Sequence, residues 1–141
     1  MRITWNWIQA GFAAIGAFLG WFFGDIDGLL VTLIVLVIVD YLTGVLRAIN
    51  MRKLSSEIGA KGISKKIIVF LLVGVAHMLD VEILGAGDAL RNAVIFFYIS
   101  NEGISIIENA VAIGLPVPDK LGNILQQLSS KKTEEKENDS K

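Results

Sequence analysis

The chain has 141 residues, of which 53% are hydrophobic and 19% charged, and its formal net charge is −1. A soluble domain of this size is less apolar, and the charge balance gives no overall basic attraction to nucleic acid. With no cysteine and one histidine, the sequence offers no disulfide, thiolate nucleophile or cysteine-based metal site, so we expect no cofactor, no metal and no enzyme activity.

The apolar residues are gathered into four blocks, each close to the roughly 17–25 residues that a helix needs to cross a bilayer. The first block carries no charge, and tryptophans near both of its ends fit interfacial anchors of a retained span better than a cleaved signal peptide. The predicted spans are residues 3–23, 28–46, 63–79 and 92–115.

The basic residues predict the orientation of these spans. The segment 47–66 holds six lysines and arginines against Glu57, whereas the links 24–27 and 80–91 are mainly acidic. By the positive-inside rule the basic loop and both termini are cytoplasmic, and this loop is expected to contact anionic lipid headgroups. Its basic residues are Arg47, Arg52, Lys53, Lys61, Lys65 and Lys66.

The chain changes character after Pro116 and Pro118, which cannot continue a helix smoothly. Residues 119–130 have leucine and isoleucine at helical spacing and predict a short amphipathic helix. Residues 131–141 carry four lysines and four acids without an apolar residue, which predicts a disordered tail. The sequence thus predicts one all-α membrane domain, residues 1–130, followed by this tail.

Five polar side chains interrupt the fourth block. At 100° per residue they fall within one arc of about 120°, so the predicted helix is amphipathic although it has membrane length. Such an arc faces protein or water rather than lipid, because a central carboxylate costs roughly 2.5–3.5 kcal/mol on insertion scales. We favour assembly between copies or pore lining over a network that only holds one compact chain together. The arc consists of Asn101, Glu102, Ser105, Glu108 and Asn109.

A further acid, Asp40, interrupts the second block about two turns from its cytoplasmic end. It could form a helix contact or respond to the state of the membrane. The interpretation we favour is an acid neutralised by a basic neighbour such as Lys65 or Arg47.

The first block contains glycines at a spacing of four residues: Gly16, Gly20 and Gly24. Ridges of small residues let two helix backbones approach closely. We expect a helix seam here, between subunits in preference to within one subunit.

Four motifs in order resemble the phage lysis and toxin-secretion holin family of Gram-positive bacteria and their phages. The resemblance covers about residues 28–128. The motifs are DYLTGVLRA (residues 40–48), LSSEIGAKGISKKI (54–67), LRNAVIFFYISNEGISIIENA (90–110) and GLPVPDKL (114–121).

This resemblance implies a homo-oligomer in the bacterial cytoplasmic membrane that opens lesions and catalyses no reaction. An endolysin or a large toxin then crosses without a required direct contact, which leads to host lysis or protein release. A narrow ion channel or transporter, or an anti-holin-type regulator, remains as an alternative.

Overall fold

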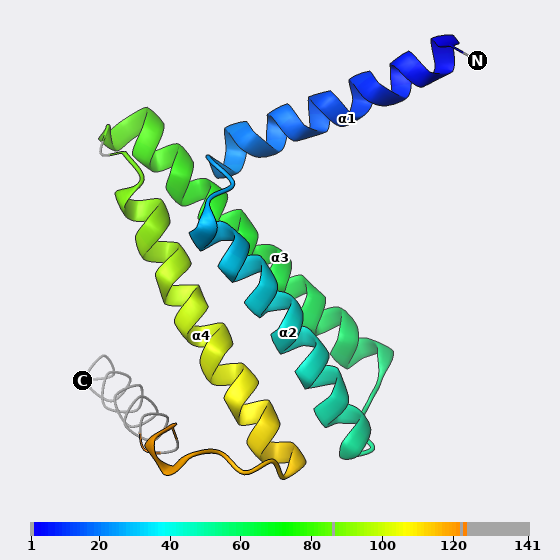
Figure 1. Ribbon diagram of the computed structural model, residues 1–141, viewed down its shortest axis with the longest axis vertical. Helices are drawn as coiled ribbons and strands as arrows, with labels where there is room; N and C mark the ends of the chain where they lie inside the picture. Colours follow the sequence, from blue (N-terminus) through cyan, green and yellow to red (C-terminus); the bar gives the residue numbers. More distant parts are fainter. Residues whose placement is uncertain (1, 86, 122, 124–141) are drawn as a thin grey trace.

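The computed structural model describes residues 2–85, 87–121 and 123, and its regular elements within them are helices (Figure 1). All four predicted helices are present, with boundaries that differ from the prediction. The elements are α1 (Arg2–Phe23), α2 (Gly28–Asn50), α3 (Ser56–Leu79), the short π-helix η1 (Asp80–Leu84) and α4 (Ala89–Ile113).

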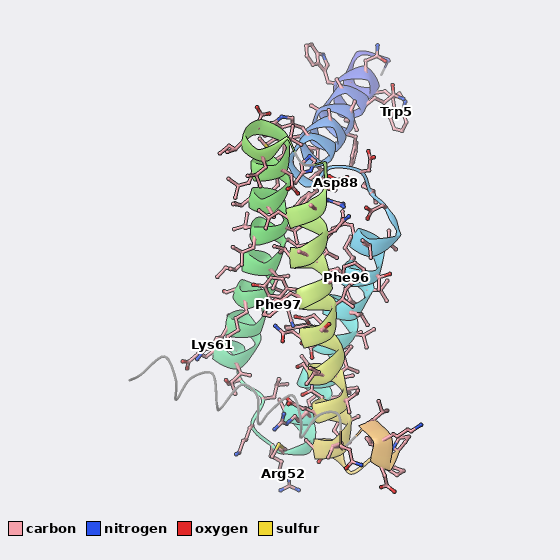
Figure 2. The ribbon with its side chains drawn as sticks, turned by 90° about the vertical axis from the view of Figure 1, so that its left-hand side faces the viewer. Trp5, Arg52, Lys61, Asp88, Phe96 and Phe97 are labelled. Atoms are coloured by element: carbon pink, nitrogen blue, oxygen red, sulfur yellow. The ribbon has the colours of Figure 1, made fainter. Side chains whose placement is uncertain are left out.

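Helices α2, α3 and α4 pack lengthwise into a bundle, in which α2 and α4 run in one direction and α3 runs in the other (Figure 1). Each contributes one fully buried side chain to the centre: Leu33, Val73 and Ile95. The end where α2 turns into α3 is called the turn end below, and the end where α1, η1 and α4 meet is called the corner end. Figure 2 shows Arg52 at the turn end and Asp88 at the corner end.

The start of α3 corrects the predicted basic loop. Ser55 caps the helix by accepting a 3.2 Å hydrogen bond from the Ile58 backbone nitrogen. Because of this cap, α3 begins at Ser56, ahead of the first apolar residues that the prediction used. The link between α2 and α3 is therefore residues 51–55 alone, and the other bases of the predicted loop are helical: Arg47 on α2, and Lys61, Lys65 and Lys66 on α3.

Helix α1 leaves the corner end and runs across the common direction of the bundle, with Trp5 near its far end (Figures 1 and 2). Its side chains are exposed along nearly the whole length. Near its root, the Phe22 ring lies on Gly74 of α3, where an added Cβ would come within 2.0 Å of that ring. Phe23 meets Phe70 edge to face, with 6.5 Å between ring centroids.

The four-span prediction requires α1 to lie alongside the bundle, and the structure does not place it there. Among the described residues, two helical stretches are long and apolar enough to cross a membrane: Gly28–Asn50 and Ser56–Leu84. Helix α4 is not among them, because the carboxylates that interrupt its apolar residues lower its mean hydropathy.

The glycine ridge of α1 is shorter than predicted. Gly24 lies beyond the last helical residue with φ +75°, a left-handed conformation that glycine adopts without strain. It is part of the corner between α1 and α2 and not of a helix face. Gly16 and Gly20 lie on α1, and a Cβ added at either would meet nothing within 4 Å apart from the adjacent residues and the backbone of its own helix. Within the single chain, no other helix therefore packs against α1 at these two positions, where a helix–helix contact was predicted.

The predicted amphipathic helix 119–130 and tail 131–141 lie almost wholly outside the described residues. Of them, the structure describes 119–121 and 123, where the Leu121 backbone nitrogen donates to the Pro118 carbonyl at 2.8 Å.

Candidate functional site

A polar cluster inside the bundle, nearer its turn end, joins all three helices. The Lys66 ammonium of α3 pairs with the carboxylates of Asp40 on α2 and Glu102 on α4. All three side chains are largely buried, at 19%, 9% and 7% exposure respectively. We call these residues, with Asn109, the bridging cluster.

Asn109 completes the cluster from the next turns of α4. Its amide nitrogen donates to Asp40 Oδ1 at 3.2 Å and to Thr43 Oγ1 at 3.1 Å. Its amide oxygen accepts a long, 3.4 Å hydrogen bond from Arg47 Nη1. A buried polar group is costly unless its hydrogen bonds are made, and here α2 and α4 make them for each other.

Charge balance explains why Lys66 reaches inward. Two carboxylates buried without a cation would be strongly destabilising in this apolar bundle, and the ammonium lies against both. The sequence predicted an acid neutralised by a basic neighbour at Asp40, and the neighbour in the structure is Lys66, not Lys65 or Arg47. Lys66 therefore does not serve the inner-surface role that the sequence suggested for it.

The predicted polar arc of α4 is divided between two environments. Glu102 and Asn109 are buried against the other helices of the same chain. Ser105 and Asn101 are half-buried and line separate cavities, of about 200 Å³ and 280 Å³. Glu108 is exposed on the bundle surface. The internal network that the sequence left as an alternative is thus what the single chain forms for the two most buried members.

Lys66 is a lining residue of both cavities. One also contains Asp40, Ser105 and Asn109 among its lining residues, and the other contains Glu102. The polar side chains in each lining and this volume allow bound water, since a cavity needs only about 10–15 Å³ of accessible volume for one molecule. The bridging cluster is therefore close to space that water can enter.

A second polar cluster ties the corner end together around Arg91 of α4, whose side chain is 1% exposed. Its guanidinium donates to the Phe23 carbonyl at 2.6 Å, to the Asp25 carbonyl at 2.7 Å and to Asp27 Oδ2 at 2.8 Å. The Phe23 carbonyl belongs to the end of α1, where helical carbonyls lack partners within the helix. Arg91 thus holds the corner between α1 and α2 against α4.

Asp80 of η1 adds a cap to this corner. Its fully buried carboxylate accepts hydrogen bonds from the backbone nitrogens of Leu90, at 3.1 Å, and Arg91, at 2.8 Å. It therefore satisfies donors at the start of α4 and complements the positive end of that helix. His77 lies nearby, with Nδ1 3.4 Å from Asp88 Oδ1.

Arg91 also changes the ionisation of Asp27. The hydrogen bond from the Arg91 guanidinium lowers the pKa of Asp27 below its usual 3.8, and burial opposes this to a smaller extent. The Leu30 backbone nitrogen, which Asp27 caps at 2.9 Å, also stabilises the charged form.

Sequence reasoning missed the corner cluster, although one signal pointed toward it. Arg91 is the single base of a link that otherwise carries Asp80, Glu82 and Asp88. A lone base at the same level as several acids is a candidate ion-pair partner. Its specific contacts with the α1 end could not be foreseen, since they require that α4 returns to that corner. Within the described residues no group of His, Asp and Glu side chains could hold a metal ion.

The model of the bacteriophage holin family matches residues 17–130. This chain belongs to the bacteriophage holin family. The match spans α2, α3 and α4 together with the root of α1, so it contains both polar clusters. Family membership and the two apolar helices indicate a membrane protein.

One curated relative is itself named as a holin. A probable holin of Bacillus phage phi105 is 36% identical over 107 residues, which cover 76% of this holin-family chain and 78% of the relative. An uncharacterized 14.9 kDa protein of Clostridium perfringens is 42% identical, covering 90% of this chain and 96% of the relative. A Listeria monocytogenes protein, also uncharacterized, is 42% identical over 92% of both chains. No solved structure matches the chain significantly.

Proposed function

We propose that copies of this chain gather in the bacterial cytoplasmic membrane and open lesions through which a folded protein leaves the cell. An endolysin reaching the cell wall by this route leads to host lysis, and a large toxin would be released in the same way. Membership of the holin family supports the class of protein, and the polar face of α4 supports the mechanism.

The observation that carries this proposal is the bridging cluster. A helix bundle of membrane length contains two buried carboxylates, a lysine and an asparagine. Ionisable groups in such a position are expensive and mark sites where polar contacts or water are needed. In the single chain α2 and α3 cover the most polar side of α4, so this arrangement represents the closed state.

In the bilayer we propose four crossings with both termini cytoplasmic. The turn end then faces inward, where Arg52 and Lys53 contact anionic headgroups at roughly 1 kcal/mol per basic residue. Helix α1 is apolar throughout its second half and long enough to cross, at about 1.5 Å per residue. This arrangement requires α1 to fold back from its direction in the structure, and residues 24–27 are where that change would occur.

Opening would exchange contacts within the chain for contacts between chains and with water. Above a threshold density, neighbouring copies replace α2 and α3 as the cover of α4, and its polar face then lines the opening. A change of this kind needs no ligand, because increasing concentration favours the state with more contacts between copies.

Two substitutions test the role of the acids. The double variant Glu102→Leu with Glu108→Leu should fold and insert, since Lys66 keeps Asp40 as a one-to-one partner. It should delay or abolish killing, because the face that would line the lesion has lost its two charges. Timed loss of viability after induction measures the effect, and unchanged timing at equal protein level would contradict the mechanism.

Escape of protein separates this function from its alternatives. The chain is induced in a bacterium that holds a cytoplasmic endolysin or another folded reporter enzyme, and membrane potential and reporter escape are followed together. Escape of the folded reporter supports a holin. Depolarisation without escape supports a narrow channel or transporter, and the absence of both supports a regulator of another holin.

A further inference from the structure

Glu108 of α4 is an exposed carboxylate on a helix proposed to cross the membrane, so it needs a partner. No hydrogen bond or ion pair joins it to another side chain in the described part of the chain. Two bases on the helices packed against α4 are engaged elsewhere: Lys66 is paired with Glu102, and half-buried Arg47 bonds to Asn109. The chain itself does not supply a cation to Glu108.

An exposed cation lies at the same depth on another helix. The contact between Lys66 and Glu102 fixes the relative level of α3 and α4, which run in opposite directions. From that contact, Lys61 lies five residues toward the turn end on α3, about 7.5 Å at 1.5 Å per residue. Glu108 lies six residues toward the same end on α4, about 9 Å, so the two differ in depth by less than the reach of a lysine.

Lys61 also points away from its own bundle (Figure 2). Its side chain is exposed and has no ion-pair partner among the described residues. Copies that lie side by side in one bilayer share the same depth. An outward cation on one and an outward carboxylate on the next are then complementary.

We propose that Glu108 of one copy pairs with Lys61 of a neighbouring copy, and that this contact joins copies of the chain in the membrane. The pair deepens the proposed function and rests on it, since it names the partner of the outward part of α4 as a second copy. It leaves the bridging cluster intact, so copies can associate before any lesion opens. The pair also gives Glu108 a partner in a region where lipid offers none.

Charge reversal with complementation tests the pair. The variants are Lys61→Glu and Glu108→Lys, each expressed alone and both expressed together as separate chains. Either variant alone places like charges at the contact and should lower crosslinked dimer in isolated membranes about tenfold. Together they restore opposite charges between the two chains, so dimer and reporter escape should return to nearly the wild-type level.

The matched control is Lys120→Glu, which makes the same charge change at another exposed lysine that has no part in the proposed contacts. Carbodiimide, which joins an amine to a carboxylate in direct contact, gives a direct readout. Wild-type membranes should yield a Lys61 to Glu108 crosslink between an isotope-labelled and an unlabelled chain. The control should leave this crosslink within about twofold of wild type.

Two results of the dimer measurement would overturn the pair. The first is an unchanged amount of crosslinked dimer in the single variants. The second is a dimer level that returns when both changes are in one chain but not when they are in separate chains, which would place the pair inside a single copy. If wild-type protein forms the crosslinked dimer but releases no reporter, the proposed function fails and the contact stands. If reporter escapes normally from both single variants, the contact fails and the function stands.

Discussion

At the residue scale, Lys66 should contribute strongly to stability because two buried carboxylates share it. The interior of the bundle can hold the carboxylates of Asp40 and Glu102 because the Lys66 ammonium pairs with both. Removing one member of a buried ionic group leaves the others uncompensated, whereas replacing the whole group by neutral residues of similar size is often tolerated.

We predict that Lys66→Met lowers the free energy of unfolding in detergent micelles by about 3–5 kcal/mol. Denaturant titration followed by tryptophan fluorescence measures this. Lys65→Met removes the same charge from the adjacent exposed position and should change the value by less than about 1 kcal/mol.

The triple variant Asp40→Asn, Lys66→Met and Glu102→Gln should recover most of that loss, because it leaves no charge in the bridging cluster. Equal stability of Lys66→Met and wild type would show that the bridging cluster does not hold the helices together.

Asp27 gives a pH dependence at the corner end. Its pKa is lowered in the folded chain, so its charge stabilises folding above the usual value of 3.8 and loses that effect as pH falls through the lowered folded value. Asp27→Asn keeps a side chain that can cap α2 but removes the charge.

The melting temperature of wild type should therefore exceed that of Asp27→Asn at neutral pH. The difference should shrink once the pH drops below about 4. Thermal unfolding of both proteins across pH 2–7 measures it, and a difference that stays constant over this range would contradict the contact with Arg91.

At the element scale, the sequence identified four helices but not how they meet. The blocks at 3–23 and 28–46 became α1 and α2 with small changes, because apolar runs of that length have few other solutions in a bilayer. The start of α3 was placed seven residues late, since the Ser55 cap and the polar turn after it have no apolar periodicity. The direction of α1 depends on contacts with α3 and α4 that no local pattern contains.

The site shows the same division. The periodicity of α4 correctly grouped Glu102 with Asn109 on one face, since spacing along a helix is a local property. It could not show that α2 and α3 of the same chain cover that face. The sequence places Lys66 at the inner surface because it belongs to the basic segment 47–66, which was expected to be a loop. In α3, to which the second half of this segment belongs, adjacent residues point about 100° apart, so Lys66 can face the bundle interior while Lys65 is exposed.

The root of α1 depends on the absence of a side chain at Gly74, where the Phe22 ring lies. Gly74→Ala should displace the ring and loosen α1, which a shift in the emission of neighbouring Trp21 in micelles would report. Gly16→Ala is the matched control, because its Cβ would meet nothing within 4 Å. It should leave the emission unchanged and raise stability by up to about 1 kcal/mol through helix propensity. Identical spectra for both variants would contradict this packing.

At the scale of the whole molecule, the absence of cysteine allows the membrane arrangement to be read with single introduced thiols. The proposed four crossings place Lys53 and the start of α1 inside and Ile83 of η1 outside. A membrane-impermeant maleimide added to intact cells should label Ile83→Cys and should not label Lys53→Cys or Asn6→Cys until the cells are broken. Labelling of Asn6→Cys from outside would show that α1 keeps the direction it has in the structure.

The place of Arg91 in the chain bears on how the protein is made. Arg91 hydrogen-bonds to residues 23–27, which are synthesised more than sixty positions earlier. Helices α1 and α2 are therefore made before the residue that joins the corner between them to α4. In a nascent chain that stops short of this arginine, the contacts of Phe22 and Phe23 with α3 are the ones left to hold α1. The contacts between this corner and α4 can therefore form only after the start of α4 has been translated.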